Sequence, residues 1–110
     1  MISKKHDKYI LLKDEHNDIE KFAPFLEGIF KQFEGENIIV DLLQYKEASL
    51  MQLVNFLELS NQHRATRQSF VLVNDALSPD DIPEELMVVP TLQEAEDVIE
   101  MEEIERDLGF

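Results

Sequence analysis

The residues best placed for chemistry follow an apolar stretch in the middle of the chain. Ser49 opens a segment with helical spacing of apolar residues, and Gln52 follows it three positions later. This pair is typical of a capping box, in which each side chain bonds the other residue's backbone N–H. The preceding run Ile38–Val40 is β-branched and uncharged, as in a strand buried on both faces. The order predicts a hydroxyl and free backbone N–H groups at the carboxyl end of a strand, where α/β proteins usually keep their sites.

The other reactive groups form weaker patterns. His6, His16 and His63 fall in different predicted elements, and no spacing directs two imidazoles to one metal ion, so we interpret each as a surface residue. Asp41 lies within the central strand, where we expect it to hydrogen-bond a loop or else to bind a partner group. The chain has no cysteine and only three glycines, which excludes thiol chemistry and a glycine-rich phosphate loop. These patterns predict no catalytic residue, no metal and no cofactor.

The elements that position these residues alternate between strands and helices. Apolar patterning places them at residues 8–13 (strand), 22–33 (helix), 37–43 (strand), 49–64 (helix), 69–73 (strand), 86–89 (strand) and 91–108 (an acidic helix). This order favours right-handed crossovers. We therefore predict a single α/β domain at residues 8–110, with a mainly parallel four-stranded sheet covered by helices. Residues 1–7 are polar and without periodicity, and we expect them to be disordered.

The first helix carries a stripe of apolar residues that predicts packing on the sheet: Phe22, Phe25, Leu26, Ile29, Phe30 and Phe33. Pro24 interrupts the front of this helix. Either the regular helix begins near Ala23, or an earlier turn from Asp18 is kinked at the proline.

The helix that opens at Ser49 is expected to expose some apolar residues. At 100° per residue, one face carries Leu50, Leu53, Val54 and Leu57. Leu59 then points to the opposite side, and Met51 and Phe56 lie on the flanks. Exposed apolar groups on a covering helix indicate a contact surface, although single exposed apolar residues are also ordinary.

The charge of the chain restricts its partners. It has 24 acidic and 10 basic residues and a formal net charge of −14. Binding to nucleic acids or anionic membranes depends on Lys and Arg, so we expect neither as a direct ligand. Residues 94–107 hold eight acids and one arginine, which indicates a solvated acidic face or a site for a basic partner. We see no membrane-spanning run and no leader, and we expect a soluble, cytoplasmic protein.

The order of elements, the capped helix after the central strand, and the closing strand followed by Pro-Thr-Leu-Gln-Glu-Ala together resemble the STAS family, the sulfate transporter and anti-sigma factor antagonist domains. The resemblance runs from about Tyr9 to Ile99. It is strongest to small STAS-like proteins of Bacteroidetes that are encoded beside ribonuclease Z. The histidine-rich metallo-hydrolase motif of that nuclease is absent here, so the resemblance does not imply nuclease activity.

In the STAS family, a partner kinase phosphorylates a serine or threonine at the start of the helix after the central strand, and this controls docking. Ser49 is the counterpart by position. Glu47 and Ala48 stand where an aspartate is usual, and Leu50 and Met51 replace small residues and a glycine. We interpret Ser49 first as a helix cap and second as a phosphoacceptor.

The sequence thus predicts a non-catalytic, regulatory protein-interaction module that is not an enzyme. The expected partner-binding residues are Ser49, Leu50, Met51, Gln52, Asn55 and Leu59. The alternative is a structural homodimer or an accessory subunit of a larger enzyme, for instance a nuclease, that associates through the Phe-rich or the acidic helix. A carboxylate enzyme is a third interpretation, and it requires a carboxyl group with a strongly raised pKa in a cleft.

Overall fold

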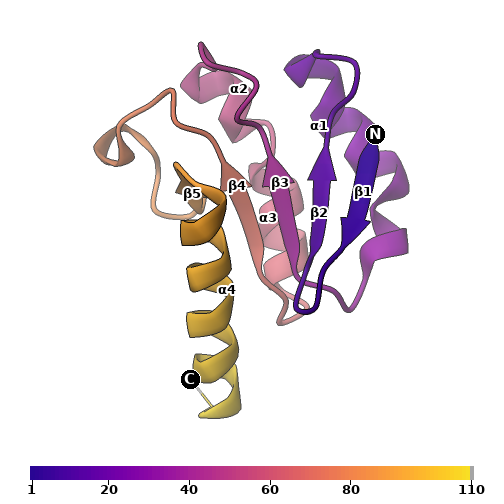
Figure 1. The fold of residues 1–110 in the computed structure, drawn as a ribbon, viewed down its shortest axis with the longest axis vertical. Coiled ribbons are helices and arrows are strands. Elements are labelled where there is room, and N and C mark those ends of the chain that lie inside the picture. The colour runs from indigo at the N-terminus through magenta and orange to yellow at the C-terminus, as the bar shows by residue number, and fades with distance from the viewer. Residues whose placement is uncertain (110) are drawn as a thin grey trace.

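The strands of this single-domain α/β protein form one mixed sheet, with the five strands in the order in which they occur in the chain (Figure 1). The computed structural model describes residues 1–109; Phe110, the last residue of the predicted domain, lies outside them. In chain order the elements are β1 (Ile2–Lys5), β2 (Ile10–Lys13), α1 (Ile19–Ile29), the 3₁₀ turn η1 (Phe30–Phe33), β3 (Ile38–Asp41), α2 (Leu50–Val54), α3 (Leu57–Arg64), β4 (Phe70–Val73), the 3₁₀ turn η2 (Pro79–Asp81), β5 (Val88–Val89) and α4 (Leu92–Asp107).

The sheet is covered on both faces. Strands β2 to β5 pair in parallel, and every residue of β3 and β4 is buried. On one face α1, α2 and α3 contribute Phe22, Leu53 and Leu59 to the larger core, and Phe56 joins them from the turn before α3. On the other face Ala95 and Ile99 of α4 pack in a second, smaller core. None of the helices described for residues 1–109 is both long and apolar enough to cross a membrane.

Strand β1 lies in the segment that we expected to be disordered, and it gives the sheet a fifth strand instead of the predicted four. It pairs antiparallel with β2, with Ile2 opposite Lys13 and Lys5 opposite Ile10. All four of its side chains are exposed. Backbone pairing, and not burial of side chains, therefore holds this strand, which explains why its composition carries no strand signal. Polar and lysine-rich edges are typical of strands that do not pair with other molecules.

Helix α1 begins earlier than the phenylalanine stripe indicates. Asp18 is its N-cap and accepts a hydrogen bond from the backbone N–H of Lys21 at 3.3 Å. The helix therefore includes Pro24, in agreement with the second of the two predicted starts. Phe22 is buried, but Phe25 is 49% exposed, so that one member of the predicted core stripe faces solvent.

The predicted helix from Ser49 to Arg64 is divided into α2 and α3 by a turn at residues 55–56. The prediction that Leu59 points away from the core is wrong, because its side chain is 1% exposed. His63 is also no surface residue: it is 3% exposed and packs edge-on against Phe30 and Phe70. Burial lowers the pKa of His63, so the imidazole is neutral near pH 7. Because this buried face includes polar residues, apolar spacing alone selects the wrong side of the helix.

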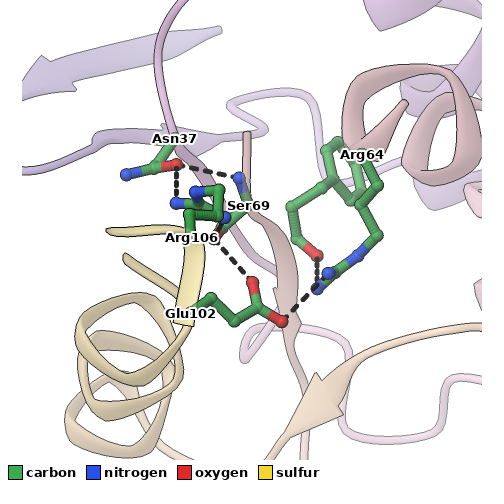
Figure 2. A network of polar contacts seen from close by, with 6 residues as sticks. Asn37, Arg64, Ser69, Glu102 and Arg106 are labelled. Carbon is green, nitrogen blue, oxygen red and sulfur yellow. Dashed lines mark hydrogen bonds and ion pairs between the residues drawn. The ribbon is translucent and has the colours of Figure 1, made fainter. Parts of the chain in front are cut away.

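A polar network fastens the C-terminal half of α4 to the amino ends of β3 and β4 (Figure 2). The carboxylate of Glu102 accepts hydrogen bonds from Ser69 Oγ at 2.6 Å and from Arg64 Nη1 at 2.9 Å. Arg106 donates to Ser69 Oγ and to Asn37 Oδ1, each at 3.2 Å. Asn37 Oδ1 also accepts the backbone N–H of Ser69 at 2.8 Å. The network thus attaches the helix to the sheet beyond the last apolar contacts.

Glu102→Ala is expected to lower the free energy of unfolding by about 2 kcal/mol, because it removes the ion pair of the Arg64 guanidinium and leaves the Ser69 hydroxyl without its acceptor. Urea denaturation at neutral pH measures this change. Glu100→Ala is the matched control on the same helix. The exposed Glu100 has one ion pair, 3.8 Å from Lys8, and its loss is expected to cost less than about 0.5 kcal/mol. Equal losses in the two variants would show that the network does not hold α4.

Candidate functional site

The loop after β3 lies at the carboxyl edge of the sheet and has a defined structure. The backbone N–H of Tyr45 donates to the carbonyl of Leu42 at 3.0 Å, and the N–H of Ala48 donates to the carbonyl of Tyr45 at 3.3 Å. At the start of the loop, Asp41 Oδ1 accepts the backbone N–H of Leu43 at 3.0 Å. Asp41 therefore makes the loop hydrogen bond that we considered for it. These turns lead the chain from the end of β3 to Ser49.

Asn74, in the loop after β4, ties that loop to the one after β3. Its side chain is buried, and its Nδ2 donates to the carbonyls of Leu42 at 2.9 Å and Tyr45 at 3.0 Å. Its Oδ1 accepts the backbone N–H of Ala76 at 3.0 Å. No pattern in the sequence singled out Asn74. Its position directly after a buried strand is the one signal that indicates this contact.

Asp14 connects the loop after β2 to the same region. Its buried carboxylate accepts hydrogen bonds from the hydroxyl of Tyr45 and from the backbone N–H groups of His16 and Asp18, the latter two at 3.0 Å. Burial by itself raises the pKa of Asp14, but the three hydrogen bonds outweigh burial and hold the pKa below its ordinary value. Burial and the bond to Asp14 raise the pKa of Tyr45. Asp14 is therefore ionised at neutral pH. A general acid needs a raised pKa so that it is protonated there.

Ser49 lies at the end of this loop, and the predicted capping box is confirmed. Ser49 Oγ accepts the backbone N–H of Gln52 at 3.2 Å, and Gln52 Oε1 accepts the backbone N–H of Ser49 at 3.0 Å. Gln52 Nε2 also donates to Glu20 of α1 at 3.3 Å. Ser49 is exposed and is not covered by other segments. Its hydroxyl is therefore accessible to another molecule, although it already accepts one hydrogen bond.

Five of the six predicted partner-binding residues lie together on α2 and its two caps. Leu50 and Met51, directly after Ser49, are 37% and 73% exposed, and Asn55 at the end of the helix is also exposed. We call this the α2 surface: Ser49, Leu50, Met51, Gln52 and Asn55. Leu59 is the exception, because it is buried in the core and cannot contact a partner.

An open depression of about 510 Å³ adjoins the α2 surface. The loops after β2 and β3 line it with Asn17 and Tyr45, and Gln52 lines it from α2. The depression and the α2 surface thus share Gln52. Together they offer polar groups beside exposed apolar side chains.

The three histidines lie in three different places. His6 stacks on Tyr9 with ring centroids 4.6 Å apart, His16 is in the loop after β2, and His63 is in the core. Within residues 1–109, no group of three or more His, Asp and Glu side chains is placed to hold a metal ion.

Comparisons of the sequence with protein-family models and with curated proteins give no match. The resemblance to the STAS family therefore stays a prediction that depends on the order of elements and the position of Ser49.

Tyr45→Phe is expected to raise the pKa of Asp14, since the substitution removes a hydrogen bond to the carboxylate and leaves its burial in place. A carboxyl group whose pKa is lower in the folded than in the unfolded state stabilises the fold above the unfolded-state pKa, about 3.9, and this stabilisation is lost as the pH falls below that value. The variant is therefore expected to be about 1 kcal/mol less stable than the wild type at neutral pH, with a smaller difference in acid.

An NMR titration of the Asp14 carboxyl carbon measures its pKa. Urea denaturation at neutral pH and at acidic pH measures the stability of the two proteins. Tyr9→Phe is the control, because the Tyr9 hydroxyl donates to Glu96 of α4 at 3.0 Å and not to Asp14. An unchanged Asp14 pKa in Tyr45→Phe would contradict the assigned hydrogen bond.

Proposed function

We propose that this protein is a non-catalytic, cytoplasmic regulatory module of the STAS type, which docks another protein through the α2 surface. The observation that carries the proposal is the exposure of Leu50 and Met51, at 37% and 73%, directly after the capped Ser49. The order of elements and the position of Ser49 support the STAS assignment.

The surroundings of the α2 surface favour binding in a second way. The loop that precedes it is tied to its neighbours by buried Asn74 and Asp14. A surface that is already ordered loses little conformational entropy when a partner binds. Burial of an exposed Met or Leu side chain contributes about 1.5–3 kcal/mol to association. The α2 surface therefore combines apolar contact area with a fixed backbone.

Met51→Glu is expected to weaken partner binding at least about tenfold, because it places a charge in the apolar contact. The partner is first identified in the source organism by a photo-crosslinking amino acid at position 51, with the exposed position of Glu27 on α1 as the negative site. The affinity of the purified partner is then compared between wild type and variants.

Ile104→Glu is the matched control, since Ile104 is equally apolar and 60% exposed, but lies on α4. It is expected to bind this partner as the wild type does. Undiminished binding by a folded Met51→Glu protein would place the docking site elsewhere. Leu59→Glu is unsuited to this test because it puts a charge into the core.

Phosphorylation of Ser49 is the form of regulation that we propose for this docking. A phosphate adds about two negative charges beside an apolar contact, which opposes binding. Ser49→Asp keeps a good N-cap residue and adds charge, so we expect unchanged stability and about tenfold weaker partner binding. Ser49→Ala removes the cap without adding charge, so we expect a loss of about 1 kcal/mol in stability and normal binding.

Thermal unfolding and the same binding assay separate these effects. Equal partner affinity of all three proteins would contradict regulation at Ser49 while leaving the docking proposal intact. Intact-mass measurement of protein from its own cells shows whether the phosphorylated form exists.

A second candidate function is association through the acidic C-terminal helix, as a homodimer or as an accessory subunit of a larger enzyme. The exposure of Met101, Ile104 and Leu108 on α4 favours it. Light scattering distinguishes the two forms, because a homodimer has twice the mass of the single chain.

A further inference from the structure

Helix α4 presents a row of apolar side chains to solvent. Met101, Ile104 and Leu108 are 61%, 60% and 66% exposed, and their spacing of three and four residues places them on one side of the helix. The side that packs on the sheet carries Ala95 and Ile99 instead. In Figure 1 the last turns of α4 extend past the ends of the strands. The row is therefore an apolar surface of the outer layer and not part of the core.

Acidic side chains flank this row on the solvent side of the helix. Helical spacing brings five exposed acids to this side: Glu94, Asp97, Glu100, Glu105 and Asp107. Lys8 Nζ lies 3.8 Å from Oε1 of Glu100 and pairs with this rim. The arginine of α4, Arg106, is directed inward to Ser69 and Asn37 (Figure 2). We call the three apolar residues and the five acids the α4 face.

We propose that the α4 face binds a basic amphipathic helix of a partner protein. Apolar side chains of that helix would pack on Met101, Ile104 and Leu108, and lysines or arginines on its flanks would pair with the acidic rim. Complementary charge on both sides of an apolar contact specifies such a partner. A second copy of this chain is the poorer occupant, because two α4 faces would bring their acidic rims together and repel.

The α4 face is held in place by the remainder of the fold. The bonds from Arg64 and Ser69 to Glu102, which lies between Met101 and Ile104 in the chain, keep this half of α4 against the sheet. The α2 surface belongs to a helix on the opposite face of the sheet. The two proposals are thus independent, and the variants of one serve as controls for the other.

A synthetic helical peptide tests this proposal with the full-length protein. The peptide has leucines spaced i, i+3 and i+7 and lysines on both flanks. A scrambled peptide of the same composition has no apolar face, and a third peptide has glutamates in place of the lysines. Fluorescence anisotropy is expected to give a Kd on the order of 10 µM for the first peptide and at least about tenfold weaker binding for the other two. Affinity for the first peptide is expected to fall as salt rises.

The double variant Met101→Ser with Ile104→Ser is expected to weaken binding of the first peptide at least about tenfold, since it removes apolar contact area. Phe25→Ser is the matched control, because Phe25 is 49% exposed and lies on α1. Met51→Glu is a second control. Both controls are expected to bind the peptide as the wild type does. Thermal unfolding checks that all variants are folded.

Several outcomes would overturn the proposal. Equal affinity for the ordered and scrambled peptides would show attraction by net charge alone. Undiminished binding by the double variant would place the peptide on another surface. A dimer in sedimentation equilibrium that dissociates in the double variant would identify a second copy of this chain as the occupant of the α4 face. Absence of binding at low salt would remove the site altogether.

Discussion

Burial of β3 and β4 on both faces is the constraint on which this structure depends. Their side chains are inaccessible on either side, so each face of the sheet needs a covering layer. On one face α1, α2 and α3 supply that layer with large apolar side chains. On the other face α4 does so in the described part of the chain. Apolar packing of α4 ends near Ile99, and Glu102 and Arg106 continue the attachment with polar contacts.

Buried polar side chains perform the same task at both ends of the sheet. At the carboxyl edge, Asp14 and Asn74 bond backbone groups that the sheet and the helices leave free. At the amino edge, Asn37 bonds the carbonyl of Lys8 and the backbone N–H of Ser69, and Arg64 of α3 bonds the carbonyl of Phe70. A buried backbone group without a hydrogen-bond partner costs free energy, so these residues hold the loops in one conformation. The accessible Ser49 is presented by this fixed framework.

Features encoded by neighbouring residues could be predicted from the sequence. The central strands follow from their uncharged β-branched runs, and the cap at Ser49 follows from two side chains three residues apart. Strand β1 could not be predicted, because its backbone pairing leaves no mark on side-chain composition. The burial of Leu59 could not be predicted either, because the sheet-facing side of α3 also contains Ser60 and His63.

In the candidate site, too, contacts between neighbouring residues could be predicted and contacts between distant residues could not. The geometry of Ser49 and Gln52 is local and was predictable. The bonds from Tyr45 to Asp14 and from Asn74 to Leu42 join residues about thirty positions apart, as the separations of 31 and 32 show. No pattern within a single loop reports such pairs, since they depend on which strands become neighbours in the sheet.

Helix α4 also determines how copies of this protein behave toward each other at high concentration. Beneath it lie Ile39 and Val71, paired neighbours on an apolar face of the two central strands that would associate with the same face of another molecule if it were uncovered. The helix that conceals this face also carries eight of the 24 carboxylates between residues 94 and 107. Helix α4 thus covers the apolar face of the strands and also supplies charge by which two copies of the protein repel each other. Loss of α4 would expose the apolar face of the strands and remove these carboxylates, so copies of the protein would associate.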